Sequence, residues 1–138
     1  MHALDEAWRV LMPQGRLIDL RPYCLEMPLE LVRDEHMELI DSLDSSASEP
    51  DDRAADQAFA AAVHRRIIKQ LTAEFFHSAY YWSSVEELLA DYNEKWNDDI
   101  VLPGKVVSKA HRLVKKQPGC ARLRIVVRSK LVVYERQG

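Results

Sequence analysis

The residues able to do chemistry are few, and their spacing does not indicate a metal or nucleophile site. His64, His77 and His111 lie on different predicted elements, and no pair of histidines has HxH or HxxxH spacing. Cys24 and Cys120 are far apart in the sequence, so we expect two free thiols in a reducing cytoplasm. GxSxG, Walker, CxxC and paired-carboxylate motifs are all missing from the sequence. We therefore expect no bound metal and no independent hydrolase activity.

Asp19 is the carboxylate best placed to meet a ligand. It lies at the end of the predicted strand 16–20, and open α/β sheets bind ligands at the carboxyl ends of their strands. With Arg21 and Tyr23, it would line a small-molecule pocket. The alternative, at least as well supported, is a strand-end carboxylate that forms an ion pair with Arg21.

A second candidate pocket comes from the segment EFFHSAYYW, residues 74–82. There His77, Tyr80 and Tyr81 would face a small apolar or aromatic ligand. The favoured alternative is an aromatic strand packed in the core, with the polar tips of its side chains hydrogen-bonded.

Charge is distributed unevenly along the chain. The net charge of −3 combines about +9 in residues 105–138 with about −12 before them. A basic face formed by Lys115, Lys116, Arg122, Arg124 and Arg128 could contact phosphates. Because no aromatic residue except Tyr134 is placed for base stacking, we favour a solvated face, or one docked on the acidic region of a second copy, over nucleic-acid binding. No apolar run approaches the roughly 20 residues that span a bilayer, so we expect no membrane partner.

Length and composition indicate one domain, because 138 residues with 47% apolar and 30% charged side chains are typical of a single globular unit. Helical periodicity and strand alternation predict its elements. We expect the acidic stretch 42–52 to be a flexible loop. The last segment is expected to be either a hairpin turning near Ser129 and Lys130 or one long, bent strand. The expected helices are 4–11, 51–72, 85–96 and 103–116, the last ended by Gln117-Pro118-Gly119; the expected strands are 16–20, 29–33, 37–41, 74–82 and 122–134.

The segment ALDEAWRVLMPQGRLIDLRP, residues 3–22, combines a helix, a turn and an apolar strand. It resembles the segment of class I S-adenosylmethionine-dependent methyltransferases that usually has the form ALREAxRVLRPGGRLxxxxP, with Gln14 in place of the first of two glycines. AYYWSSVEELLADYNEKW, residues 79–96, is similar to hFxSLEEwLxY near the end of some members. The resemblance implies an α/β fold, α+β in appearance: part of a Rossmann-like sheet with flanking helices. Residues 16–20 would be a central strand beside the terminal strands, with Asp19 near the substrate pocket.

The cofactor-binding half of that family has no counterpart in this sequence. The family holds its cofactor at a glycine-rich turn after its first strand, whereas the four glycines here form no GxG. We therefore expect the chain alone to bind no S-adenosylmethionine, and expect such binding only if a partner supplies the missing half. One edge of strand 16–20 would then be unpaired, which proteins rarely leave open. We expect a homodimer or a complementary chain to cover it.

The leading hypothesis is a methyltransferase-like protein without its own cofactor site. It would be non-catalytic alone, or one component of a split or truncated methyltransferase; whether Met1 is the natural start stays open. The first alternative is a dimeric α+β module that binds a small molecule in an aromatic pocket. The second is a nucleic-acid binder that uses the basic C-terminal region. No catalytic residue is assigned under any of the three.

Overall fold

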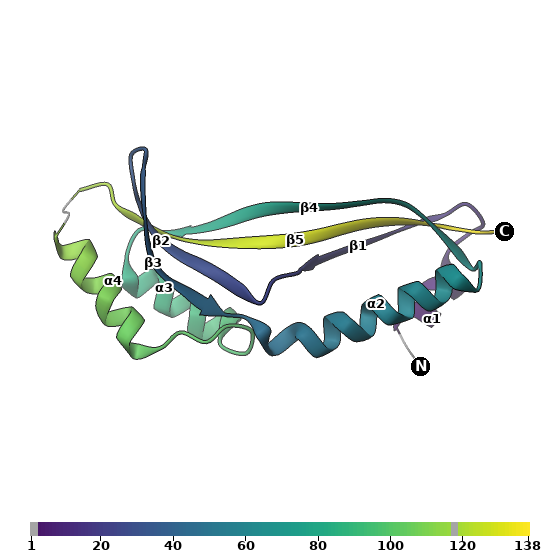
Figure 1. The fold of residues 1–138 in the computed structure, drawn as a ribbon, viewed down its shortest axis with the longest axis horizontal. Helices are drawn as coiled ribbons and strands as arrows, with labels where there is room; N and C mark the ends of the chain where they lie inside the picture. Colours follow the sequence, from purple (N-terminus) through teal and green to yellow (C-terminus); the bar gives the residue numbers. More distant parts are fainter. Residues whose placement is uncertain (1–2, 117–118) are drawn as a thin grey trace. The chain divides into compact units, whose positions relative to one another are not determined.

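The computed structural model describes residues 3–116 and 119–138. Within them the chain is a mixed α+β protein with four α-helices and an open sheet of five strands (Figure 1). The expected helix end at Gln117 and Pro118 falls outside the described residues. No helix in the described part is long and apolar enough to cross a membrane. The helices are α1 (Ala3–Val10), α2 (Glu49–His64), α3 (Val85–Asp91) and α4 (Gly104–Lys116), and the strands are β1 (Arg16–Pro22), β2 (Glu26–Arg33), β3 (His36–Asp44), β4 (Ile68–Trp82) and β5 (Arg122–Arg136).

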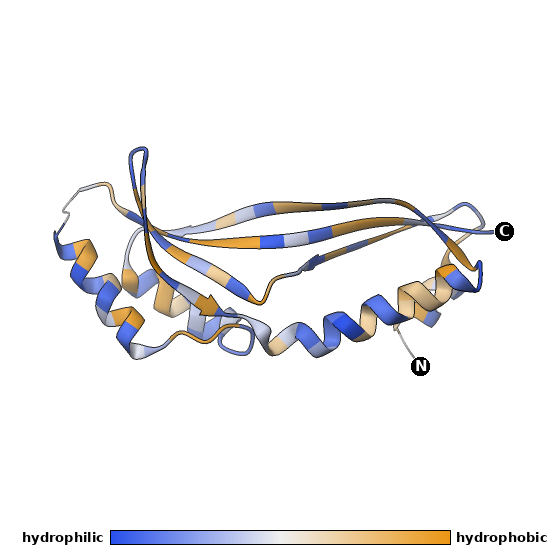
Figure 2. Cartoon of the chain, in the orientation of Figure 1, coloured by the Kyte–Doolittle hydropathy of each residue, from blue (hydrophilic) through white to orange (hydrophobic). Residues whose placement is uncertain are grey.

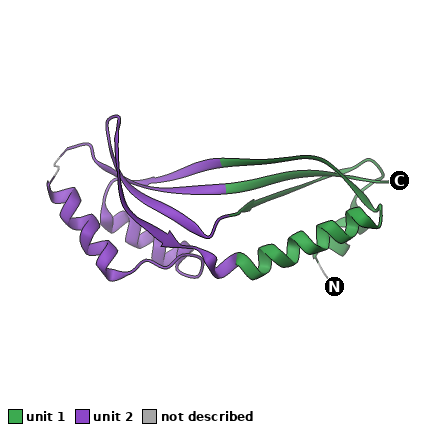
Figure 3. Cartoon of the chain, viewed as in Figure 1, with its two compact units in different colours: residues 1–23, 49–76, 129–138 green, residues 24–48, 77–128 purple. Residues whose placement is uncertain are grey.

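Contacts divide the chain into two compact units (Figure 3). Unit 1 comprises residues 1–23, 49–76 and 129–138, and unit 2 comprises residues 24–48 and 77–128. The strands β4 and β5 each contribute residues to both units.

Unit 1 is built on the last eight residues of β5. β1 pairs with them antiparallel, from Arg16 opposite Glu135 to Pro22 opposite Ser129. β4 also pairs with β5, and the Gln137 N–H donates to the Ile67 carbonyl at 2.9 Å, so β4 starts where β5 ends. β1 and β4 therefore run in the same direction. The core of this unit comprises the buried side chains Phe59, Ala62, Ile68, Val132 and Tyr134, with Leu4, Trp8 and Leu17 packed against them.

The turn between α1 and β1 requires unusual backbone geometry. Gln14 has a positive φ of 64°, a left-handed conformation that glycine adopts most readily. A Cβ on Gly15 would lie 2.7 Å from the Met12 carbonyl oxygen, too close for any side chain. The pair Gln14-Gly15 thus occupies two positions at which the backbone favours glycine.

Unit 2 contains the β2–β3 hairpin, the first seven residues of β5, and α3 and α4. The hairpin pairs Arg33 with His36 and has a bulge between Leu29 and Glu30, and β2 also pairs with β5. Ser84 caps α3 by accepting the Glu87 N–H at 3.1 Å, as expected for a capping box. A π-helical turn, η2 (Tyr92–Trp96), follows α3. Among the residues that the structure describes, the core comprises fifteen buried residues, including Leu29, Leu123 and Ile125 of the sheet and Val106 and Ala110 of α4.

The predicted helix 51–72 is wrong at its C-terminal end. α2 ends at His64, and residues 68–76 belong to β4. The Arg66 N–H donates to the Val63 carbonyl and the Ile67 N–H to the Ala62 carbonyl, both at 3.0 Å, while Arg66 has a φ of 58°. These are the bonds of a Schellman C-cap, in which the left-handed residue is usually glycine. Arg66 takes that role here, so the sequence carries no stop signal.

Two other expectations are decided by the structure. The stretch 42–52 forms regular elements instead of a loop: the end of β3, a 3-10 turn η1 (Ser46–Ser48) and the first turn of α2. Its serines and acidic residues fit these positions because such side chains bond to nearby backbone N–H groups, as Asp44 does with the Ser46 N–H at 2.9 Å. The last segment is a single strand, not a hairpin.

Replacing Arg66 with glycine should stabilise unit 1. Arg66→Gly removes the penalty of a left-handed non-glycine residue and is expected to raise the free energy of unfolding by about 0.5–1 kcal/mol. Arg65→Gly is the matched control, because it changes the same charge at the neighbouring position without relieving a positive φ, and should lower stability. Urea unfolding measures both variants. Equal effects of the two substitutions would contradict the cap assignment.

Candidate functional site

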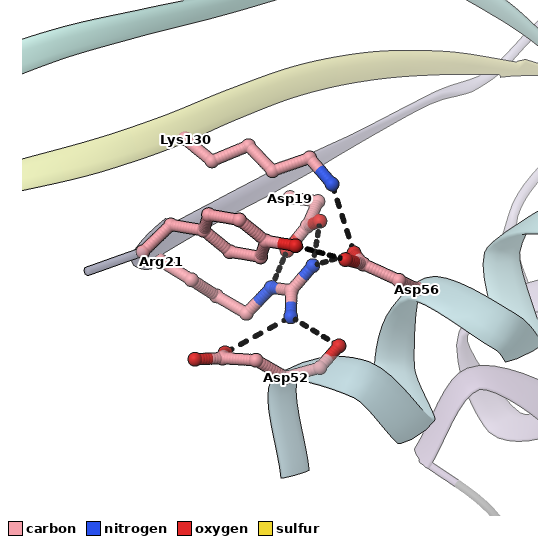
Figure 4. A network of polar contacts seen from close by, with 6 residues as sticks. Asp19, Arg21, Asp52, Asp56 and Lys130 are labelled. Atoms are coloured by element: carbon pink, nitrogen blue, oxygen red, sulfur yellow. Dashed lines mark hydrogen bonds and ion pairs between the residues drawn. The ribbon is translucent and has the colours of Figure 1, made fainter. Parts of the chain in front are cut away.

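Arg21 on β1 is the centre of a polar network in unit 1 (Figure 4). Its Nε and Nη2 donate to the two carboxylate oxygens of Asp19, each at 2.8 Å. Its Nη1 donates to the Asp52 carboxylate at 3.0 Å and to the Asp52 backbone carbonyl at 3.1 Å. Nη2 also reaches Asp56 Oδ1 at 2.7 Å. A bidentate, largely buried pair of this kind is much stronger than an exposed ion pair.

Asp56 on α2 accepts hydrogen bonds from three donors: Arg21 and Tyr23 in or just after β1, and Lys130 on β5. Lys130 Nζ on β5 donates to Asp56 Oδ1 at 2.8 Å, and the Tyr23 hydroxyl donates to Oδ2 at 2.8 Å. The Lys130 ammonium also lies 4.8 Å from the centre of the Tyr23 ring, within cation–π range. Asp56 thereby ties α2 to both β1 and β5.

The ionisation of this network argues against proton transfer near neutral pH. Burial by itself raises the pKa of Asp56, but hydrogen bonds from Lys130, Arg21 and Tyr23 outweigh it and lower the pKa to about 2. The hydrogen bond to Asp56 raises the pKa of the Tyr23 hydroxyl, and the one to Asp19 raises the pKa of Arg21. A general acid or base works best with a pKa near the working pH. These shifts indicate a structural role for the network. We call its residues the clamp: Asp19, Arg21, Tyr23, Asp52, Asp56 and Lys130.

The clamp has a clear packing role. The buried residues of α2 are Phe59 and Ala62, both in the C-terminal half of the helix. The N-terminal half is held instead by Asp52 and Asp56, which lie four residues apart and so share one helix face. Asp19, Arg21 and Tyr23 were predicted from the sequence, whereas Asp52, Asp56 and Lys130 were not. The i,i+4 spacing of the two aspartates was the available signal.

The other predicted pocket residues do not converge. His77, Tyr80 and Tyr81 are all exposed on β4 in unit 2. The Tyr80 ring meets the Trp96 ring edge-on at 4.8 Å, whereas Tyr81 lies on the other side of the strand, beneath the Arg122 guanidinium at 4.6 Å. The apolar cavity beside Trp82 and Trp96 has a volume of about 10 Å³, which is room for no more than one water. This cavity cannot hold an aromatic ligand.

The predicted basic face is divided between two sides of unit 2. Leu123, Ile125 and Val127 are buried in the core with Val106 and Ala110 of α4, so the alternate residues of β5 face away from α4. Arg124 on that outer side donates through Nε to Glu30 at 2.8 Å. Lys115 and Lys116 are exposed at the end of α4. Arg122 and Arg128 lie on β5 in the same alternation as Arg124 and are exposed.

β1 has one paired and one unpaired edge, and we call the unpaired one the open β1 edge (residues 16–22). In the described part of the chain its strand partner is β5 alone, on the opposite side. Leu17 and Asp19 face the core and the clamp, so Ile18 and Leu20 face the other way. Their side chains are 62% and 56% exposed. An apolar strand with a free edge is a docking site for another strand.

Acid should weaken the clamp in a defined pH window. The pKa of Asp56 is about 2 in the folded chain against an ordinary value of 3.8, so its contribution is complete above about pH 5 and is lost as the pH falls through 4 toward 2. Asp56→Asn should lower the free energy of unfolding by about 1–2 kcal/mol at pH 7 and flatten its acid dependence. Urea titrations between pH 2 and 7 measure this. Asp51→Asn, exposed on the same helix, is the control; an acid profile of Asp56→Asn that matched it would contradict the clamp.

Comparisons with known proteins add no function to this geometry. No protein-family model, curated protein or solved structure matches the chain. What the clamp and the open β1 edge can do is therefore inferred from their own residues.

Proposed function

We propose that this chain supplies the terminal part of a methyltransferase-like sheet and that a partner segment carrying a glycine-rich turn completes it. The observation that carries the proposal is β1, an apolar strand paired on one edge and open on the other. Alone, the chain is inactive, because its own residues include no glycine-rich turn.

The turn before β1 supports the proposal. The resemblance places two glycines where this chain has Gln14 and Gly15. Gln14 has the positive φ that glycine favours, and Gly15 leaves no room for a Cβ. Gln14 therefore differs from the expected glycine in its side chain, while its backbone has the left-handed conformation that glycine favours.

The strand arrangement in unit 1 also supports it. The resemblance puts the terminal strands beside strand 16–20, and all seven residues of β1 pair with β5. β1 and β4 run in the same direction with antiparallel β5 between them. Sheets of mixed direction are common among doubly wound folds.

The exposed face of β1 indicates what the partner must bring. Ile18 and Leu20 lie opposite Val133 and Leu131 of β5, which gives an apolar strip on the side of the sheet away from Leu17. Strands of doubly wound sheets are covered on both faces. The partner segment would thus add a strand at the open β1 edge and an apolar helix over this strip, and with its glycine-rich turn would bind S-adenosylmethionine.

The cofactor prediction can be tested directly. Isothermal titration of S-adenosylmethionine into the isolated chain should give no binding heat, because its sequence has no glycine-rich turn of the kind that lets the backbone approach the cofactor closely. Micromolar affinity would overturn the proposal.

The open β1 edge can be tested by amide hydrogen exchange. Alternate N–H groups of an edge strand point away from its one neighbour, so alternate amides of residues 16–21 should exchange rapidly in the monomer while the others are protected. Uniform protection in a monomer shown by light scattering would mean that the edge is already covered, and the proposal would fail. Uniform protection in a dimer would mean that a second copy covers the edge, which seals the sheet without supplying a glycine-rich turn.

Two double variants test whether the apolar strip at Ile18 and Leu20 mediates association. Ile18→Lys with Leu20→Lys should leave the free energy of unfolding within about 0.5 kcal/mol of the parent, but should abolish any association through β1. Leu25→Lys with Leu39→Lys is the control, since these side chains are 56% and 57% exposed in unit 2. Loss of association in the control pair, with the β1 pair unaffected, would locate the interface elsewhere.

A further inference from the structure

A stripe of basic, histidine and serine side chains runs along one side of α4 in unit 2. Figure 2 shows hydrophilic and hydrophobic bands alternating along this helix. The apolar side is in the core, where Val106 and Ala110 are 2% and 1% exposed. The residues of the opposite side, which we call the α4 stripe, are Lys105, Ser108, His111, Arg112, Lys115 and Lys116.

The α4 stripe is free to meet an anion. Ser108, His111, Arg112, Lys115 and Lys116 line one shallow groove of about 550 Å³. Arg112, Lys115 and Lys116 form no ion pair with the residues that the structure describes. α4 contains no aspartate or glutamate, and Glu86 lies 3.9 Å from His111 Nδ1.

Spacing along the helix matches a phosphate backbone. Positions 108, 111, 112, 115 and 116 follow i, i+3, i+4, i+7 and i+8, so they share one face. At 1.5 Å per residue they extend over about 12 Å, which equals the rise of three or four nucleotides along a duplex axis at about 3.4 Å per nucleotide of one strand. Arg112 adds a guanidinium, which can bind a phosphate through two hydrogen bonds.

We propose that the α4 stripe binds the phosphate backbone of a nucleic-acid duplex without reading its sequence. A membrane surface fits less well, because a helix that lies in a membrane inserts its apolar face, and that face of α4 is buried in the core. A protein partner also fits less well, since stable protein interfaces centre on aromatic or apolar residues and the stripe has none. Phosphate contacts need only positive and hydroxyl donors.

Salt dependence measures the number of contacts. Fluorescence anisotropy with a labelled duplex of 20 base pairs should give micromolar affinity at low salt. With four cations engaged, the slope of log affinity against log salt should be about −3.5, which is roughly a hundredfold loss between 50 and 200 mM salt.

The variants locate the contact. Arg112→Gln with Lys115→Gln and Lys116→Gln should reduce the slope to about −1 and weaken binding at low salt at least tenfold. Arg65→Gln with Arg66→Gln and Lys69→Gln removes the same charge from exposed positions in unit 1 and should keep the parent slope. Circular dichroism checks that both variants fold.

Three results would overturn the inference. The first is a duplex affinity that does not fall with salt, and the second is an equal loss in the two triple variants. The third is binding to vesicles with 30% phosphatidylserine but not to the duplex, which would assign the stripe to a membrane surface. None of these results bears on S-adenosylmethionine binding, so this inference and the proposed function can fail separately.

Discussion

The pairing of β5 with a neighbour on each of its edges is the constraint on which both units depend. Residues 129–136 lie between β1 and β4 in unit 1, and residues 122–128 have β2 and β4 as neighbours in unit 2. The side chains of β5 therefore define a core in each unit, with Leu123 and Ile125 in one and Val132 and Tyr134 in the other. A strand hydrogen-bonded on both sides offers no edge of its own. Free edges are left to its neighbours, and the open β1 edge is one of them.

The two faces of β1 differ in character: one carries charged side chains that already have partners, and the other carries exposed apolar side chains. Its inner face is occupied by the clamp, in which each of the charged side chains Asp19, Arg21 and Asp56 already has a partner and the pKa values move away from neutrality. Its outer face shows Ile18 and Leu20 to solvent. Chemistry at the predicted Asp19 pocket is thus less well supported by the structure than association through the strand. The same distinction holds in unit 2, where the apolar side of α4 builds the core, whereas Arg112, Lys115 and Lys116 on the other side form no ion pair with residues that the structure describes.

The elements that could be predicted from the sequence are those whose own residues carry the signal. The helices α1, α3 and α4 and the strand β1 follow from local periodicity and capping residues such as Ser84. The prediction failed at the end of α2, because Phe59, Val63, Ile67 and Leu71 keep a four-residue spacing across the boundary and Arg66 replaces the glycine that would mark it. The form of the last segment stayed open for a related reason. Buried positions on β5 change from odd to even numbers between Ser129 and Val132, and a strand that changes phase looks like two. The clamp was only partly foreseen, because Lys130 and Asp56 meet through the tertiary fold.

The exposed aromatic residues of β4 make this strand prone to aggregation. β4 is fifteen residues long, pairs with β5 alone in the described part of the chain, and exposes Phe75, Phe76 and Tyr80. It contains no proline, and its fixed charges are Lys69 and Glu74. Stretches of this composition stack into cross-β fibrils when left uncovered. A cell making this polypeptide would therefore rely on chaperones, low abundance or rapid burial to keep the aromatic segment from seeding insoluble deposits.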